Sequence, residues 1–557
     1  CTLFPYTTLF RSRSNCMYIV IYLQKYSYSL RAVTPMTRLP SHMDQSLPRA
    51  RWHGSVIGLL RPMSWFTPSW RSSVSIESLP LNPPQRLPYP LLYWLFDSIV
   101  DVIRKLELPQ NQFLPPTVVG DMKHIGMSIR YHRLTPVLNT RNAIEILVET
   151  INSSISVAWT YGCRNAGDTA INYGVLDWLN YEFPEITPKM ISRYARRTPD
   201  VTTTVNSLNQ RGYQYELYGG PISYNPKQQN YMEKMAALAD DMIQYVSDLS
   251  GLGKWHQQWG SELAAVIEDS DLFLFNGGNL IHHSPHRGFL PYVLAIVYPM
   301  LVARRTNTPY GLLPQTIFNL DGPYELIIKS VLNNAEFIWT RDDRTFEYLG
   351  NIKSLSVPVR KGLDIGFFAC SHQQSNSRHE NPGSNIAVVP RFSELGDTGE
   401  ITEKEESSIE TMLKQYMSEK AATGNTVTVV VQTNSEKEWV EENDEFLDTE
   451  GIRVFESFKQ NELCSFYANC DLLLTMRLHA GIFALSQGTP AIGIYRDEWG
   501  PKIPGTWEAL DIGDFTQSWE TLSLQTLYSL TSSLLEERES MSETIQERIQ
   551  ERTTYMS

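Results

Sequence analysis

Cysteine and long apolar runs are both scarce in this 557-residue sequence. Its six cysteines include no CxxC pair, which excludes a disulfide-built scaffold and argues against a zinc ribbon. No run of about 18 uncharged apolar residues occurs, so a polytopic membrane protein is excluded. Hydrophobic residues make up 42% and charged residues 20% of the chain, so the composition favours a folded core over disorder.

Positive charge is scarce outside the first 72 residues. That stretch holds nine Lys/Arg and one acidic residue, Asp44, whereas the remainder holds 39 basic and 60 acidic residues. Binding to nucleic acid requires clustered Lys and Arg, so the acidic body predicts no nucleic-acid partner. A small anionic substrate remains compatible with it, because such a ligand requires only a local basic pocket.

The first 150 residues show little regular periodicity. Residues 1–12 resemble translated sequencing-adapter read-through, and 30–90 are rich in Pro, Ser and Arg. We expect residues 1–85 to be artefact followed by disordered or linker sequence. Residues 86–150 are expected to form a helical extension. Within it, 87–103 suits an amphipathic helix on the main body, with a membrane anchor as the alternative.

Short apolar strands alternate with helical stretches from about residue 154 onward. This alternation predicts the α/β class, with parallel sheets covered on both faces. A Gly/Ser/Asn-rich segment at 371–384 separates two such runs, which predicts Rossmann-like domains at 151–370 and 385–515 and a helical segment at 516–557. A helix at 292–304 is expected to be broken or kinked near Pro299. The acidic stretch 394–450 suits a solvated helical face. Strands are predicted at 155–160, 271–275, 337–340, 386–389, 426–432, 471–475 and 490–494.

The first candidate site segment lies between a strand and a helix. Small residues from Gly162 to Gly167 would let backbone N–H groups approach an anion at the helix N-terminus. The segment is neither GxGxxG nor a Walker loop, and a plain tight turn explains it equally well. Asp168 would either face the ligand or cap the helix.

The second candidate segment follows the strand at 271–275. The chain continues through Gly277 and Gly278 and then places His282, His283 and His286 close together. Ligands in open α/β sheets bind at the carboxyl ends of strands, so these residues are binding candidates. The spacing is not HExxH, so a metalloprotease is not supported. Isolated histidines are commonly structural, which is the alternative.

The third candidate segment places Arg477 and His479 between a buried strand and a helix rich in small residues. Arginine offers a planar fork to a phosphate or carboxylate, and histidine exchanges protons near neutral pH. Gly481 would let the helix N-terminus approach a ligand. Arg341 directly follows another strand, which favours a ligand-facing role. The alternative for Arg477 is an internal salt bridge, with Asp471 or Asp497 as its partner.

Taken in order, these segments resemble the polysaccharide pyruvyl transferase family. The resemblance covers about residues 154–500. It is carried by NxGD at 165–168, by the strand and glycine pair at 273–278, by Pro314-Gln315, by Arg341 and, most specifically, by the segment from Arg477-Leu-His479 to Gly488-x-Pro490.

The resemblance implies a GT-B-like fold with the site in a cleft between the two domains. It implies transfer of a pyruvyl group from phosphoenolpyruvate to a sugar diol of a glycan or polysaccharide, forming a pyruvate ketal. Neither a metal nor a cofactor is expected. Arg477 and His479 are the expected catalytic residues, and His282, His283 and His286 would contact the acceptor. The residues expected to bind the donor are Arg341, Leu478, Gly481, Gly162, Asn165, Gly167, Asp168, Gly277 and Gly278.

Two alternatives remain open at this point. A nucleotide-sugar glycosyltransferase of the same fold would use a similar glycine loop and arginine, with Glu498 as its ribose-binding residue. A non-catalytic member would only bind glycans. A eukaryotic enzyme that modifies surface glycans would be expected in the Golgi membrane or lumen, which the sequon at Asn152 supports weakly, and otherwise a cytoplasmic location is expected.

Overall fold

The structure is a computed structural model that describes residues 154–556, except 164, 197–200, 210, 224–230, 251–260, 283–289, 321–323, 371–383 and 393–402. Contacts divide the chain into Cys1–Arg86 and Leu87–Ser557, and every described residue belongs to the second unit. The sequence-based expectations for residues 1–150, and the sequon at Asn152, therefore lie outside the described residues. In the part of the chain that is described, no helix combines the length and apolarity needed to cross a membrane.

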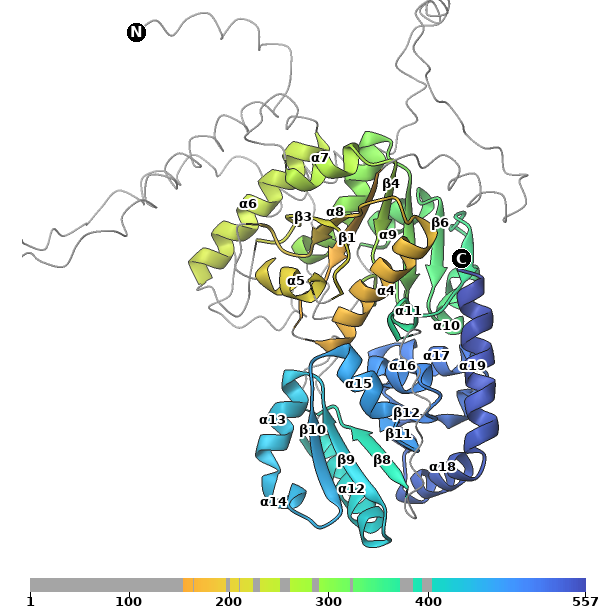
Figure 1. Cartoon of the computed structure of the whole chain (residues 1–557). Coiled ribbons are helices and arrows are strands. Elements are labelled where there is room, and N and C mark those ends of the chain that lie inside the picture. The colour runs from red at the N-terminus through yellow and green to blue at the C-terminus, as the bar shows by residue number, and fades with distance from the viewer. Residues whose placement is uncertain are drawn as a thin grey trace, which may run out of the picture. The chain divides into compact units, whose positions relative to one another are not determined.

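The first sheet contains seven parallel strands in the order β3-β2-β1-β4-β5-β6-β7 (Figure 1). The chain starts in the middle of the sheet, adds strands toward one edge, and then returns to build the other half. Its central strands are fully buried, so their continuous apolar runs suit a sheet that is covered on both faces. The strands are β1 (Ile155–Thr160), β2 (Lys189–Ser192), β3 (Glu216–Tyr218), β4 (Leu272–Phe275), β5 (Tyr310–Gln315), β6 (Phe337–Thr340) and β7 (Val359–Lys361).

Helices connect these parallel strands, as crossover connections require. Helix α8 contains Pro299 and continues through it, so the expected break is wrong, whereas the alternative of a kink stays a prediction. Side chains 293–303 of α8 are buried along most of the helix, and this packing holds the segment together across the proline. The helices of this half are α4 (Ala166–Glu182), α5 (Val201–Leu208), α6 (Tyr231–Leu249), α7 (Glu262–Glu268), α8 (Leu290–Thr306), α9 (Glu325–Asn333), α10 (Asp343–Gly350) and α11 (Gly366–Cys370).

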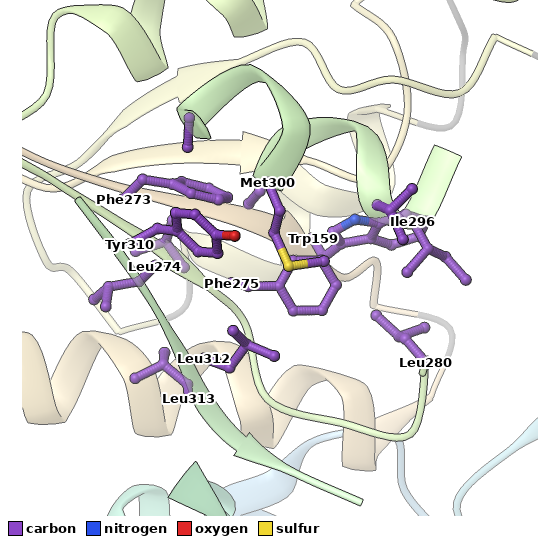
Figure 2. Packing of buried hydrophobic residues seen from close by; sticks show 14 of the residues in the cluster. Trp159, Phe273, Leu274, Phe275, Leu280, Ile296, Met300, Tyr310, Leu312 and Leu313 are labelled. Atoms are coloured by element: carbon purple, nitrogen blue, oxygen red, sulfur yellow. The ribbon is translucent and has the colours of Figure 1, made fainter. Parts of the chain in front are cut away.

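Apolar side chains from β1, β4, β5 and α8 form the core of the first half. Figure 2 shows Trp159, Phe273 and Phe275 from the strands packed with Met300 of α8. The rings of Trp159 and Phe275 lie 6.3 Å apart at an interplanar angle of 56°. Burial of aromatic side chains of this size provides much of the driving force for folding.

The second sheet contains six parallel strands in the order β10-β9-β8-β11-β12-β13. Side chains alternate along β8: Ala387 and Val389 join one apolar cluster, whereas Ile386 and Val388 join another. This period of two means that both faces of the sheet are covered. The strands are β8 (Asn385–Val389), β9 (Thr426–Val431), β10 (Ile452–Glu456), β11 (Leu472–Thr475), β12 (Ala491–Tyr495) and β13 (Thr516–Ser518).

Helices of the second half continue the same pattern of strand and crossover. Helix α12 packs on β9, and α16 follows β11 directly (Figure 1). The helices are α12 (Glu403–Ala422), α13 (Asn434–Glu442), α14 (Asp444–Leu447), α15 (Gln460–Tyr467), α16 (Leu478–Ser486), α17 (Lys502–Ala509), α18 (Leu524–Glu536) and α19 (Arg538–Thr554), together with the 3-10 turns η9 (Asp497–Trp499), η10 (Gly513–Phe515) and η11 (Trp519–Thr521).

The two sheets share an apolar core where their helices meet. Ala166, Ala170 and Tyr173 of α4 cluster with Leu463 of α15 and Leu478 of α16. Polar contacts add to this packing, because residues 165 and 433 form an antiparallel bridge and Arg344 binds Glu508 at 2.7 Å. The ends of α4 and α16 are therefore held against each other, which positions the site described below.

Helix α19 packs on α16 and then contacts the first half of the fold. Arg552 binds Asp343 of α10 at 3.0 Å, and the indole N–H of Trp178 donates to the Met556 carbonyl at 3.0 Å. Met556 is 2% exposed and belongs to the core of the first sheet. A charged helix at this position could pack across both halves of the fold or project into solvent. In the structure it packs across both halves.

These observations confirm the predicted α/β class with two Rossmann-like domains. The strand β1 is predicted to the residue, and the other predicted strands begin and end within two residues of the observed bounds. The expected helical segment 516–557 instead begins with strand β13, which adds an edge to the second sheet.

Candidate active site

The strongest cluster of candidate residues lies where β6, α4 and α16 come together. It contains Arg341 at the end of β6, Asp364 before α11, and His479 in the first turn of α16. All three side chains are largely buried, with exposed fractions of 2%, 1% and 15%. The cluster therefore draws one cation and one carboxylate from the first half and an imidazole from the second.

Arg341 is fixed by two hydrogen bonds to neighbouring side chains. Its Nε donates to the Thr316 hydroxyl at 2.7 Å, and its Nη1 donates to Asp364 Oδ2 at 2.7 Å. Thr316 in turn donates to Asp342 Oδ2 at 2.6 Å, and burial raises the pKa of the Asp342 carboxyl. The guanidinium is thus oriented by an internal network, and its predicted contact with a donor stays a prediction.

Asp364 connects Arg341 to His479. Its Oδ1 accepts from the Gly366 N–H at 2.8 Å and lies 3.7 Å from His479 Nε2, within ion-pair distance if the imidazole is protonated. Burial alone would raise the pKa of this carboxyl, but His479, Arg341 and the Gly366 N–H together hold it well below its usual range. Asp364 is therefore a carboxylate that stays charged beside the imidazole.

Gly167 places the start of α4 directly against the His479 ring. A Cβ atom at this position would lie 2.3 Å from His479 Nδ1, so only glycine allows this approach. Asn165 caps α4, because its side chain accepts from the Gly167 N–H at 2.9 Å. Asp168 lies in the first turn, so its alternative role as the helix cap is wrong, and its role toward a donor stays a prediction.

Arg477 immediately precedes α16, and its guanidinium contacts α13. Its Nε donates to Glu436 Oε1 at 2.6 Å, and Nη2 donates to the Thr433 hydroxyl at 3.2 Å and to the Ser435 hydroxyl. The Arg477 side chain is 12% exposed, and that of Glu436 is fully buried. An internal salt bridge does form, as the alternative held, but neither Asp471 nor Asp497 is the acidic partner.

Glu436 corrects the interpretation of the acidic stretch 394–450 as a solvated face. Besides binding Arg477, its Oε2 accepts from the Thr433 N–H at 2.6 Å in a capping box that starts α13. This carboxylate therefore fixes both the helix start and the arginine. Many other acidic residues of the stretch are exposed, so the interpretation holds for them.

The remaining glycines of the candidate set approach protein atoms. A Cβ at Gly162 would meet Thr203, one at Gly278 would meet the Tyr161 hydroxyl, and one at Gly481 would meet the Trp507 ring at 2.1 Å. Gly481 therefore allows α16 to pack closely against Trp507 of α17. The roles of these glycines, of Gly277 and of the buried Leu478 in donor binding stay predictions.

The N–H groups of the glycine pair after β4 are already bonded within the protein. Gly277 N–H donates to Asn276 Oδ1 at 2.7 Å, and Gly278 N–H donates to the Pro314 carbonyl at 3.2 Å. Gly278 has a φ of +145°, which glycine adopts readily. The pair thus forms a strand-end turn packed on Pro314 and Tyr161.

His282 is the one predicted acceptor residue within the described ranges. It is 5% exposed and stacks on Phe318, with ring centroids 4.7 Å apart and an interplanar angle of 9°. His283 and His286 lie outside the described residues. Contact of the three histidines with an acceptor stays a prediction.

Sequence reasoning missed the two carboxylates that orient the site. Asp364 lies in a short segment after β7 that shows no periodic pattern, and Glu436 lies in an acidic run. One signal was available in the sequence: a buried arginine is costly without an anionic partner. This rule predicts that a carboxylate partner exists but does not identify the residue.

Comparison with known proteins assigns the chain to a family. The model of the family described as polysaccharide pyruvyl transferase matches residues 165–498, which cover most of both domains and include the cluster around His479. This match defines the protein as a transferase, and the chain belongs to the polysaccharide pyruvyl transferase family. The resemblance read from the sequence is thereby confirmed. No curated protein matches the chain.

Several solved structures are distantly similar. A UDP-N-acetylglucosamine 2-epimerase shares 14% identity at a TM-score of 0.43, covering 71% of this chain and 90% of its own. The UDP-GlcNAc 2-epimerase from Neisseria meningitidis, bound to UDP-GlcNAc, shares 12% at 0.43, covering 71% and 94%. A sucrose-phosphate synthase from Thermosynechococcus elongatus shares 12% at 0.41, covering 72% and 95%.

Proposed function

We propose that the protein transfers the pyruvyl group of phosphoenolpyruvate to two hydroxyls of one sugar in a glycan or polysaccharide, releasing phosphate. Membership in the pyruvyl transferase family supports the reaction class. The observation that carries the donor assignment is the buried chain Arg341–Asp364–His479, with Arg477 two residues from the imidazole. This arrangement combines positive charge for an anionic donor with a group that can transfer a proton.

The chemistry assigns a step to each group. Protonation of the methylene carbon of phosphoenolpyruvate by His479 makes the neighbouring carbon electrophilic. A sugar hydroxyl attacks that carbon, phosphate leaves, and the second hydroxyl closes the ketal. One hydroxyl proton replaces the proton given by His479, and the other leaves with phosphate. Arg341 and Arg477 would stabilise the carboxylate and phosphate charges, so the proposal needs no metal.

Asp364 has a positioning role in this scheme. It lies against His479 Nε2 and anchors Arg341, so one carboxylate sets the distance between the proton donor and a donor-binding cation. Its depressed pKa keeps it charged while His479 cycles between its protonation states. The carboxylate would thus orient the imidazole for proton transfer.

The experiment is phosphate release from phosphoenolpyruvate in the presence of galactosides, glucosides and mannosides. We expect acceptor-dependent release that His479→Ala and Arg477→Ala abolish. Lys437→Ala is the matched control, because Lys437 lies beside Glu436 but makes an exposed pair with Glu456. Folded protein that neither binds nor turns over phosphoenolpyruvate would contradict the proposal, and nucleotide sugars would then be tested.

A further inference from the structure

Arg193 is an arginine of the first sheet that has no part in the site described above. It follows β2 directly, so it lies at the carboxyl end of a strand, the end at which ligands of open α/β sheets bind. Its backbone is fixed, because its N–H donates to the Thr160 carbonyl at 3.1 Å and its carbonyl accepts from the Ile222 N–H at 3.4 Å. The side chain therefore starts from a rigid position.

The Arg193 guanidinium contacts aromatic rings instead of a carboxylate. Its Cζ lies 5.6 Å from the centre of the Trp159 ring and 5.5 Å from that of Tyr194. Trp159 has a φ of +68° at an irregularity in the β1–β2 register, a rare conformation for a bulky residue. This local geometry places the indole ring next to the guanidinium.

Within the described ranges, the acidic residue that acts on Arg193 is Asp168, which does so through its charge and not through a hydrogen bond or ion pair. Its side chain makes neither a hydrogen bond nor an ion pair there, and its Nε is buried without a hydrogen-bond partner. By contrast, Arg341 binds Asp364 and Arg477 binds Glu436. A partly buried guanidinium is costly unless something pairs with it, so the missing partner is the notable feature.

Arg193 also lies close to the residues of the candidate active site. Burial acts to lower its pKa, but Tyr292, Tyr194, Tyr161 and Asp168 together raise it, so Arg193 stays charged. The charges of Arg193 and Arg341 both act to lower the pKa of Tyr161, which burial raises. The Tyr161 hydroxyl donates to the Gly277 carbonyl at 2.9 Å. The charge of Arg193 therefore acts at the same sheet edge as Arg341.

We propose that Arg193 binds an anionic oxygen group, a phosphate or a carboxylate, of a substrate of this site. Arg341 and Arg477 each contact a carboxylate, whereas the Arg193 guanidinium makes no such contact among the described residues and its buried Nε lacks a hydrogen-bond partner. The Trp159 and Tyr194 rings lie against the guanidinium, and a planar guanidinium can donate two parallel hydrogen bonds to such a group. That the anion belongs to phosphoenolpyruvate or its acceptor rests on the proposed function.

The test compares Arg193→Ala and Arg193→Lys with Arg196→Ala. Arg196 is the matched control, because it lies on the same segment but is 62% exposed and paired with Glu262 at 2.7 Å. Thermal protection by inorganic phosphate and the KM values for phosphoenolpyruvate and for the acceptor are measured for each variant. The melting temperature without ligand establishes that each variant is folded.

We expect Arg193→Ala to lose phosphate protection and to raise one KM by about 10- to 100-fold, the effect of a charge-assisted hydrogen bond. Arg193→Lys should recover part of the phosphate protection and reverse part of the rise in KM, since lysine offers a charge but no planar fork. A raised KM for phosphoenolpyruvate places the anion on the donor, and a raised KM for the acceptor alone places it on an acidic acceptor.

The inference and the proposed function fail separately. If wild type does not use phosphoenolpyruvate but is protected by phosphate only when Arg193 is present, the proposed function fails and the anion site stands. If folded Arg193→Ala keeps wild-type phosphate response and both KM values within about twofold, the inference is overturned.

Discussion

Replacing Gly167 with alanine tests whether the approach of α4 positions His479. The new Cβ would lie 2.3 Å from His479 Nδ1 and 2.5 Å from Cγ, and Cβ contacts below 3.0 Å essentially do not occur. The ring and the helix must therefore separate by about 1 Å, and a displacement of that size costs on the order of 100-fold in rate. We expect the turnover number for phosphate release to fall by about that factor.

The same substitution should leave the melting temperature nearly unchanged. Alanine inside a helix is favoured over glycine by about 1 kcal/mol, which offsets much of the strain. Gly350→Ala is the matched control, because a Cβ at the end of α10 meets nothing within 4 Å. If Gly167→Ala kept wild-type turnover under conditions where His479→Ala abolished it, the argument that Gly167 fixes the imidazole would be refuted.

Three further predictions concern buried charges and a thiol. Asp364→Asn leaves Arg341 without its carboxylate and should lower the free energy of unfolding by about 3–5 kcal/mol in urea titrations at pH 7. Because folding depresses the pKa of Asp364, its stabilisation is complete above the ordinary value of about 3.9 and is lost as the pH falls below it, so the variant should lose less stability on acidification than wild type. Glu436→Gln keeps the shape but removes the charge that holds Arg477. We expect about 1–3 kcal/mol of destabilisation together with a lower turnover number, and unchanged values for both would contradict this role. Cys464 is buried, and burial raises its thiol pKa, so iodoacetamide should label it only after denaturation, as peptide mass spectrometry would detect.

The parts of the fold that the sequence predicts are those with a strong local signal. Buried central strands such as β1 and β9 are continuous apolar runs, and their positions follow from the sequence. The strands β3, β7 and β13 are three residues long and only partly buried, so their apolar pattern is too short to identify. Each becomes a strand because a neighbouring strand supplies hydrogen bonds.

The same distinction applies to the candidate site. Arg477 and His479 stand out because polar residues interrupt an apolar segment, and the structure brings His479 beside Asp364 of the first half. Asp364 and Glu436 act through contacts between residues far apart in the sequence, so no local pattern marks them. Arg193 escapes prediction for the same reason, since its feature is a missing partner, which only three-dimensional structure reveals.

The packing of α19 also bears on how the protein folds during synthesis. Met556 belongs to the core of the first sheet and accepts the hydrogen bond of Trp178, yet the whole second sheet precedes it in the chain. Domains generally fold in the order in which the ribosome delivers them. Here the first domain must wait, with an unfilled position in its core, until the second has been translated. We expect nascent chains that stop before α19 to be degraded faster by protease in the first domain than the full-length protein.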